Sequence, residues 1–321
     1  MGAAYALRLQ DVVKSFGGFK AVNGLSFDVS PGEIFGFLGP NGAGKTTTLR
    51  MILDIIAPTS GTIDVLDSMS ANDMRHRIGY LPEERGLYRK MRAAESIAYF
   101  ARLRGVPAGK AKARAHELLE EFGLGEFARA RNEALSKGMA QKVQLLTTIA
   151  HDPDLYILDE PFSGLDPINQ ATLEKLIRRL KDAGKTIIFS THVMEHAERL
   201  CDRFLILSSG QKKFDGTLDE ARQIFPPQVT VRTNAAPAQI ADISGVVKIE
   251  ETDDGSNADE KEYRVELVRG ADPQTFLRAL IAAGLSVSGF NADSASLHDI
   301  FVRLAGDDGD RASSPDDGRE G

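Results

Sequence analysis

Short apolar runs alternate with longer helical patterns over the first two thirds of the chain. Near-continuous apolar runs occur at Glu33–Leu38, Leu155–Leu158, Thr186–Phe189 and Phe204–Leu207. Such runs are typical of strands that are buried on both faces of a parallel sheet. Residues 6–13 and 25–29 instead alternate apolar and polar positions, which predicts an antiparallel edge sheet. The pattern as a whole predicts an α/β fold with a mostly parallel sheet covered by helices.

The periodicity changes to helical spacing in the middle of this region. Apolar positions recur at helical intervals in Ala93–Leu103, Lys110–Phe122 and Met139–His151. We therefore expect a helical insert at about 92–150, within a first domain that covers 5–220.

A second domain is expected after Phe225-Pro226-Pro227, which should interrupt regular structure. Strand patterns at 229–233, 246–252, 263–268 and 287–291 alternate with helical stretches at 236–242 and 273–283. This β-α-β-β-α-β order predicts a small ferredoxin-like α+β domain over 227–304. The acidic loop 252–260 is expected to be mobile, and the acidic tail 305–321 is expected to be disordered.

Composition narrows the possible surroundings and partners. The 321 residues correspond to about two domains at roughly 150 residues each. The net charge of -7 argues against bulk attraction to nucleic acid. The single cysteine, Cys201, excludes an internal disulfide and fits a reducing compartment. The start of the chain lacks a targeting pattern and nowhere do 18 apolar residues run together, so we expect a cytoplasmic protein that does not span a membrane by itself.

The segment Gly39–Thr46 matches the G-x-x-x-x-G-K-[ST] phosphate loop. It follows a predicted buried strand and opens a helical run at 46–53, which is the context that this motif requires. Backbone N–H groups and a helix N-terminus attract phosphate oxygens, Lys45 neutralises phosphate charge, and the Thr46 hydroxyl can ligate Mg²⁺. The sequence therefore predicts a nucleotide-phosphate site.

A second apolar strand ends in two carboxylates, Asp159 and Glu160. Beside a phosphate loop, these carboxylates are candidates for a second Mg²⁺ contact and for the base that activates an attacking water. Alone, the same pattern is also common where a strand passes into a capped helix.

Further motifs identify a resemblance to a known family. Leu135–Met139, Asp159-Glu160, Ser163–Asp166 and Ser190–His192 occur in the order and spacing of an ATP-binding cassette ATPase. Over about residues 5–217 the sequence resembles the nucleotide-binding subunit of an ABC transporter. The resemblance implies that ATP and Mg²⁺ bind between two copies of the chain, with the phosphate loop of one copy facing the Leu135–Met139 signature of the other.

The resemblance also implies roles for individual residues. Glu160 would be the general base, His192 the switch residue that reaches the γ-phosphate, Asp166 a contact across the dimer, and Phe16 the aromatic residue on adenine, unless Phe16 is a plain core residue. The implied catalytic residues are Glu160, His192 and Lys45, and the implied Mg²⁺ ligands are Thr46, Glu83 and Asp159. The implied ATP-binding residues are Phe16, Gly39, Pro40, Asn41, Gly42, Ala43, Gly44, Lys45, Thr46, Thr47, Ser136, Gly138 and Asp166.

Three positions depart from the family pattern. Lys137 and Met139 replace the usual Gly and Gln of the Leu-Ser-Gly-Gly-Gln signature, and Glu83 takes the place of a usual Gln. Together they resemble a branch that serves two-component exporters of the sodium-extrusion and drug-resistance types, which also carry a small C-terminal domain.

The resulting prediction is an ATP-hydrolysing subunit of a multi-component ABC exporter. It would form an ATP-sandwich homodimer, drive a separate membrane permease and lie on the cytoplasmic face of the membrane through that partner. A soluble ABC ATPase that acts mechanically on nucleic acid or ribosomes, and a P-loop GTPase, are the competing hypotheses. The C-terminal domain is either a dimer-stabilising or regulatory module, or a ligand sensor.

Overall fold

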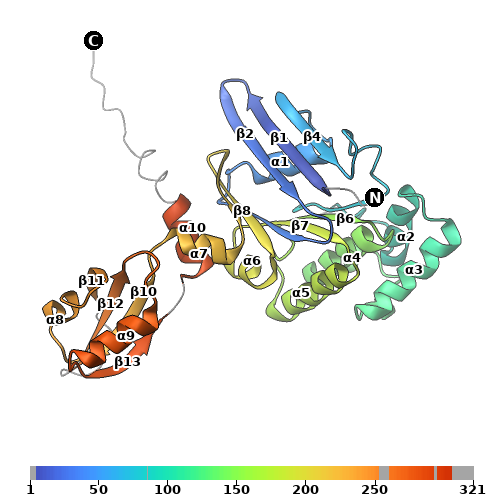
Figure 1. Cartoon of the computed structure of the whole chain (residues 1–321). Helices are drawn as coiled ribbons and strands as arrows, with labels where there is room; N and C mark the ends of the chain where they lie inside the picture. Colours follow the sequence, from blue (N-terminus) through green and yellow to red (C-terminus); the bar gives the residue numbers. More distant parts are fainter. Residues whose placement is uncertain (1–4, 85, 253–259, 293–294, 306–321) are drawn as a thin grey trace, which may run out of the picture. The chain divides into compact units, whose positions relative to one another are not determined.

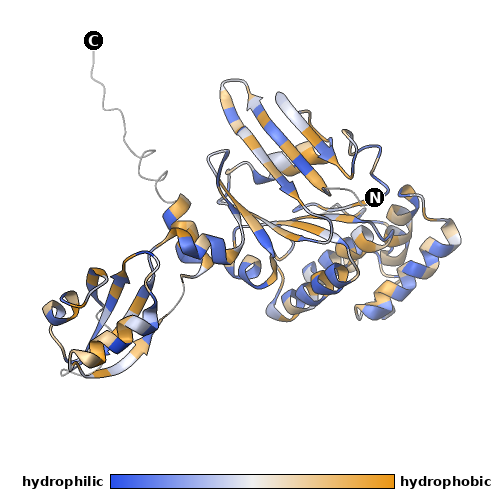
Figure 2. Ribbon diagram, in the orientation of Figure 1, coloured by the Kyte–Doolittle hydropathy of each residue, from blue (hydrophilic) through white to orange (hydrophobic). Residues whose placement is uncertain are grey.

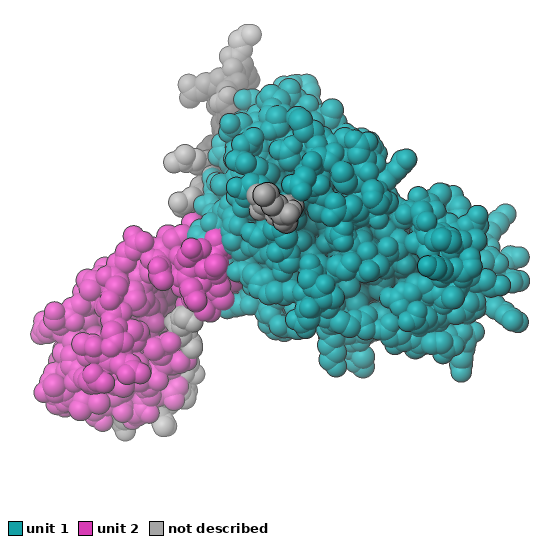
Figure 3. All heavy atoms as spheres, turned by 45° about the vertical axis from the view of Figure 1, so that its right-hand side comes forward, with its two compact units in different colours: residues 1–215, 307–321 teal, residues 216–306 magenta. Residues whose placement is uncertain are grey.

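The computed structural model describes residues 5–84, 86–252, 260–292 and 295–305. The chain forms two compact units, which divide between Asp215 and Gly216 and are coloured teal and magenta in Figure 3. Among the described residues, no helix combines the length and the apolarity that a membrane crossing requires.

A six-stranded sheet forms the centre of the first unit (Figure 1). Its order is β5-β6-β7-β3-β8-β9, and the four pairings from β5 to β8 are parallel. The strands are β3 (Ile34–Leu38), β5 (Ile78–Leu81), β6 (Leu155–Asp159), β7 (Thr186–Thr191), β8 (Arg203–Ser208) and β9 (Gln211–Gly216). The predicted parallel α/β sheet is confirmed.

The central strands are buried on both faces, which explains their continuous apolar sequence. In β6, Tyr156 and Leu158 belong to a core shared with helices of the first unit, whereas Leu155 and Ile157 belong to a second core on the opposite face. Figure 2 shows these strands as mostly hydrophobic and the helices as mixed. The helices that pack against the faces of this sheet are α1 (Lys45–Ile52), α5 (Pro167–Asp182) and α6 (Met194–Leu200).

The predicted antiparallel edge sheet is also present. β1 (Leu7–Phe16) pairs with β2 (Phe19–Val29) and with β4 (Ser60–Val65). Both pairings contain register shifts, which explains why the alternating pattern of the sequence marks only part of each strand.

The helical insert contains α2 (Ala93–Leu103), α3 (Ala108–Glu121) and α4 (Lys137–Ile149), with two short 3₁₀ turns, η1 (Gly125–Phe127) and η2 (Asn132–Ala134). α2 has the bounds that the sequence predicts, while α4 begins two residues earlier than Met139. It begins there because Ser136 caps it, with its hydroxyl accepting a hydrogen bond from the Met139 N–H at 3.3 Å.

The second unit contains an antiparallel four-stranded sheet of order β11-β12-β10-β13. Its strands are β10 (Gln228–Thr233), β11 (Val246–Thr252), β12 (Lys261–Leu267) and β13 (Val287–Asn291), and its helices are α7 (Leu218–Ile224), α8 (Pro237–Ala241), α9 (Pro273–Ala282) and α10 (Leu297–Ala305). The order of strands and helices from β10 to β13 is the predicted ferredoxin-like arrangement.

The observed bounds of this unit differ from the predicted ones at its start. The compact unit begins at Gly216 rather than at residue 227, because α7 packs with α10. Most of the predicted mobile loop, 253–259, and all but the first residue of the predicted disordered tail fall outside the described residues.

Candidate functional site

The predicted phosphate loop joins the carboxyl end of β3 to the start of α1, as the sequence predicts. At Gly44 the backbone has φ of 103°, and a Cβ atom there would lie 2.5 Å from the Ala21 carbonyl oxygen. Only glycine fits this position. The loop therefore places backbone N–H groups and the N-terminus of α1 at one point, which is a ready site for phosphate.

Lys45, the first residue of α1, lies almost wholly buried within this loop. Its ammonium group donates hydrogen bonds to the carbonyl oxygens of Gly39, at 2.6 Å, and Pro40, at 3.2 Å. These carbonyls hold the cation at the loop without neutralising it. Thr46 and Thr47 follow in the first turn of α1, both half-buried.

Glu160 directly follows β6, and its side chain reaches the same region. Its carboxylate is 8% exposed and lies 3.6 Å from the Lys45 ammonium and 3.0 Å from the Nδ1 atom of His192. His192 comes directly after β7, which neighbours β6 in the sheet. The fold thus brings together the three side chains to which the sequence analysis assigns catalysis.

The backbone at Glu160 adopts a left-handed conformation, with φ of 47°. Such a conformation costs energy for a residue other than glycine and persists only where the surrounding structure enforces it. Here its N–H donates to the Ser190 hydroxyl at 3.0 Å. The turn that aims the Glu160 carboxylate is therefore fixed from the neighbouring strand.

Ser190 also donates a hydrogen bond, at 2.5 Å, to a carboxylate oxygen of Asp159. Asp159 and Ser190 are both buried, and this hydroxyl connects the Asp159 carboxylate with the backbone of Glu160. The sequence alone predicts no role for Ser190. Its signal in the sequence is a hydroxyl residue at the end of an apolar strand, two positions before His192.

Two of the three predicted Mg²⁺ ligands, Glu83 and Asp159, line the same cavity. Asp159, Glu83 and Glu160 line one cavity of about 240 Å³, together with Lys137 and Gln144. Thr46, at the start of α1, is not among the residues that line this cavity. Hydroxyl and carboxylate oxygens are the ligands that Mg²⁺ takes together with substrate phosphates, so the donor set fits the ion.

The Leu135–Met139 signature forms the N-terminus of α4. A Cβ atom added at Gly138 would meet only the Asn169 side chain, at 3.6 Å, so the backbone here is open to close approach. Lys137 reaches over Gly164, where an added Cβ would lie 3.2 Å from its ammonium nitrogen.

Asp166 and Phe16 lie on the surface of the first unit. Asp166 caps α5 by accepting hydrogen bonds from the Asn169 N–H at 2.9 Å and from its side-chain amide at 2.6 Å. These bonds, the backbone one first, lower the pKa of Asp166. Phe16 ends β1 with 52% of its surface exposed, and the Lys14 ammonium lies 5.0 Å from its ring centre, so it is not a core residue.

Two glutamines of α4 hold the loops around Glu160, and sequence reasoning missed both. Gln144 donates to the carbonyl oxygens of Pro82, at 3.3 Å, and Glu84, at 3.0 Å. Gln141 donates to the carbonyl of Ser163 at 2.8 Å. Both lie in a helix whose periodicity indicates only packing, so the sequence offers no distinct signal for them.

Comparison with known proteins agrees with this geometry. Residues 22–163 match the family model described as ABC transporter, and residues 216–305 match the C-terminal domain of DrrA1-3-like ATP-binding proteins. The chain is 38% identical over 301 residues to the uncharacterised ABC transporter ATP-binding protein YhaQ of Bacillus subtilis, covering 94% of this chain and 98% of that protein.

A second relative and a solved structure extend the comparison. The Nod factor export ATP-binding protein I of Paraburkholderia xenovorans is 40% identical over 254 residues, covering 75% of this chain and 84% of that protein. A solved ATP-binding subunit of an ABC transporter shares 34% identity with a TM-score of 0.64, covering 68% of this chain and 92% of that one. With a phosphate loop, a carboxylate pair and a signature helix in one unit, and a relative aligned over nearly its full length, this chain belongs to the ATP-binding proteins of ABC transporters.

Proposed function

We propose that this chain is the ATP-hydrolysing subunit of a multi-component ABC exporter, in which two copies close on ATP and drive a separate membrane permease. One observation carries the hydrolytic part of this proposal. The buried Glu160 carboxylate is oriented by His192 and Ser190 and lies 3.6 Å from the phosphate-loop lysine.

In the proposed reaction, the loop from Gly39 to Thr46 and Lys45 hold the phosphates of ATP. Glu160 accepts a proton from a water molecule while the water oxygen forms a bond to the γ-phosphorus. The bond from that phosphorus to the bridging oxygen breaks, which releases ADP and phosphate. His192 holds Glu160 in place and is positioned to contact the γ-phosphate.

Mg²⁺ would be held by Thr46, Asp159 and Glu83, and would neutralise charge on the phosphates during hydrolysis. Glu83 is exposed and adds one negative charge to the cavity that Asp159 and Glu160 line. Lys137 lines the same cavity and brings a positive charge that partly offsets it.

Closure of two copies is supported by the open surface at the signature helix. The hydroxyl of Ser136 and the backbone at Gly138 stand at the N-terminus of α4, whose dipole favours an anion. We propose that this end approaches the γ-phosphate held by a second copy, with Asp166 and Phe16 exposed for contacts to the partner copy and to adenine.

Coupling to a permease would use the surface next to the Glu83 loop. Tyr88, Tyr99 and Phe100 form an aromatic cluster with ring centres 5.5–6.2 Å apart. Beside it lies a cavity of about 190 Å³ that is lined by Leu87 and Arg104 and by residues of α4 and β5. We propose that a cytoplasmic helix of the permease docks here, which places the chain at the cytoplasmic face of the membrane. The export direction rests on the relative whose name states Nod factor export.

The test uses Glu160→Gln, which keeps the size of the side chain and removes the base. ATP turnover should be lost, while ATP should convert the chain to a stable dimer in size-exclusion chromatography. A variant that hydrolyses ATP at the normal rate would show that Glu160 is not the base.

The same variant tests the partner. Affinity purification from solubilised membranes with ATP should recover one multi-spanning protein, and substitutions at Tyr88 and Phe100 should reduce its recovery. Recovery of ribosomes or nucleic acid without a membrane protein would instead favour the soluble mechanical ATPase.

A further inference from the structure

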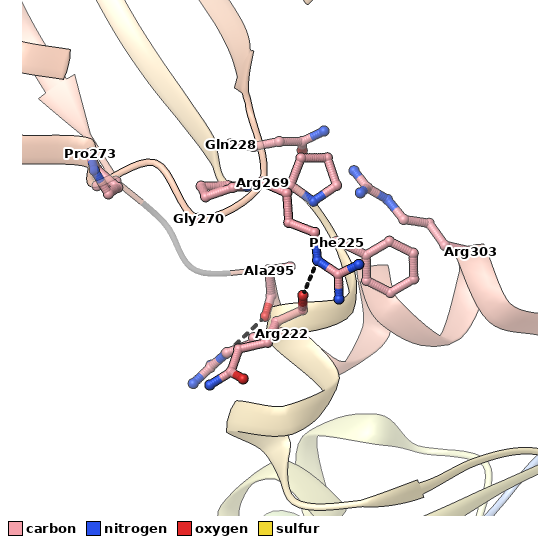
Figure 4. A pocket seen from close by; sticks show the side chains of 12 residues that line it. Arg222, Phe225, Gln228, Arg269, Gly270, Pro273, Ala295 and Arg303 are labelled. Atoms are coloured by element: carbon pink, nitrogen blue, oxygen red, sulfur yellow. Dashed lines mark hydrogen bonds between the residues drawn. The ribbon is translucent and has the colours of Figure 1, made fainter. Parts of the chain in front are cut away.

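The second unit contains a cavity that the proposed ATPase function does not use. It has a volume of about 540 Å³, which is in the range of sites for small organic molecules. Its walls come from α7 and the following Pro226-Pro227, from the turn between β12 and α9, and from α10 (Figure 4). The described residues that line it all lie between 222 and 303, within the second unit.

The charge of the lining is unbalanced. Three arginines, Arg222, Arg269 and Arg303, line the cavity, and none of the described lining residues is acidic. Asp219 pairs with Arg222 at 3.7 Å, and the Asp299 carboxylate accepts hydrogen bonds from Ser296. Because Arg222 already has Asp219 as its acidic partner, Arg269 and Arg303 are the two cations that make the hollow a local site for an anion in a chain with a net charge of -7.

The structure holds these arginines in place. The Nε atom of Arg269 donates to the Gln223 carbonyl at 3.0 Å, and the Nε atom of Arg222 donates to the Ala295 carbonyl at 3.1 Å. Both bonds are drawn in Figure 4. For Arg269 the terminal nitrogens make no hydrogen bond to the described residues. A guanidinium anchored through Nε presents its two terminal nitrogens to a phosphate or carboxylate with little loss of entropy on binding.

An aromatic ring completes the site. The Arg303 guanidinium lies 5.2 Å from the centre of the Phe225 ring, and Figure 4 shows Arg303 reaching toward this ring from α10. Phe225 is followed by two prolines that also line the cavity. The cavity therefore offers an apolar wall beside its cations.

We propose that this cavity binds a phosphate-bearing organic anion, with Arg269 and Arg303 on the phosphate and with Phe225 and Pro226 against the organic part. The phosphate belongs either to a small soluble molecule or to a lipid headgroup, and both present anionic phosphate oxygens to the arginines. Binding would tie α7 and α10 to the β12–α9 turn. The cavity shares no residue with the phosphate loop, so the proposed anion binding can be refuted without affecting the proposed ATP hydrolysis.

The test places a fluorescent reporter in the cavity. The chain contains no tryptophan, so Phe225→Trp creates a single one next to Arg303 and retains an aromatic ring under the guanidinium. The full chain is titrated with glycerol 3-phosphate and, separately, with phosphatidylcholine vesicles that contain phosphatidylglycerol. Because the phosphate loop also attracts phosphates, both titrations are repeated with Lys45→Ala.

We expect a saturable change of tryptophan fluorescence that persists with Lys45→Ala. In Phe225→Trp, the added double substitution Arg269→Gln and Arg303→Gln should weaken binding at least about tenfold, because each lost charged hydrogen bond weakens binding by that order. The matched control is Arg278→Gln, which removes the same charge from an exposed position of α9 away from the cavity and should leave the affinity unchanged. Response to glycerol 3-phosphate identifies a soluble ligand, and response only to the anionic vesicles identifies a headgroup.

The proposal is overturned if neither probe gives a saturable change, or if the double substitution binds as tightly as the parent. If Phe225→Trp does not fold, broadening of the phosphorus resonance of glycerol 3-phosphate by the unmodified chain, compared with the double variant, decides the same question. In either case ATP turnover of the double variant should match that of the parent, so loss of anion binding is distinguished from failure of the ATPase assignment.

Discussion

Replacing Ser190 with alanine should damage the site more than the loss of one hydroxyl suggests. The Ser190 hydroxyl donates to Asp159 and accepts from the Glu160 N–H, and the side chain is fully buried. Alanine leaves both partners in place without their hydrogen bond. No water can replace the hydroxyl unless the strands separate.

The magnitude follows from these two contacts. A buried polar group left unsatisfied costs about 1–3 kcal/mol, and more when the group is charged, as Asp159 is. Two such groups give about 2–6 kcal/mol, a large part of the stability of an ordinary domain. The Glu160 turn has an unfavourable φ, so without its anchor the carboxylate should move, and a shift of about 1 Å in a reacting group lowers turnover by about 100-fold.

Hydrogen exchange over β6 and β7 and steady-state ATP turnover measure these two effects. The matched control is Thr186→Val at the opposite end of β7, where the Thr186 hydroxyl accepts a hydrogen bond from the Gly32 N–H at 2.9 Å. It should lose stability and keep its turnover. The reasoning is refuted if two results occur together: the opening free energy of Ser190→Ala from hydrogen exchange lies within about 1 kcal/mol of the parent's, and the variant hydrolyses ATP at a similar rate. The Ser190 hydroxyl would then contribute neither to stability nor to turnover.

Two further predictions concern α4 and His151, which lies two residues after its end. Burial lowers the pKa of His151 to about 4, so the folded chain stays neutral there while an unfolded histidine takes up a proton below pH 6.5. Stability should therefore fall by up to about 3 kcal/mol as pH drops from 6.5 to 4, and His151→Gln should remove this component in urea titrations at the two pH values. Gln144→Leu should speed amide exchange at Glu83 and Glu84 at least about tenfold, because it removes both hydrogen bonds to that loop, whereas Gln141→Leu should affect Phe162 and Ser163 instead. Equal exchange in parent and variant would show that the glutamine does not hold the loop.

Elements with a strong hydrophobic period could be read from the sequence. The four central strands and α2 stand where the apolar runs and helical spacing indicate, because burial on two faces or along one stripe leaves a clear pattern. The sequence pattern does not indicate β4 and α7, because both have few buried positions. β4 is largely exposed over its first half, and α7 has too few buried positions to show a period.

The candidate site likewise contains residues that could be predicted from the sequence and residues that could not. The phosphate loop and Glu160 follow apolar strands directly, so their place at the carboxyl edge of the sheet could be predicted. Ser190 and Gln144 act through contacts to segments 31 and 60 residues away in sequence, and no local pattern records such pairings. The arginines of the second unit are also dispersed in sequence, and the packing of α7 with α10 beside the ferredoxin-like strands brings them to one cavity.

The position of β3 in its sheet constrains how the chain can acquire its structure during synthesis. β3 emerges early, yet both of its neighbours, β7 and β8, come from much later, with Ile34 opposite Ile187 and Phe35 opposite Arg203. Pairings over such sequence separations form slowly and only after the later strands have left the ribosome. A nascent chain that ends before β8 therefore carries the complete phosphate-binding motif on a strand that still lacks a neighbour, and a truncated product of that length should need chaperone protection. The ferredoxin-like unit that follows has all of its strand partners within its own short sequence, so its folding does not depend on this delay.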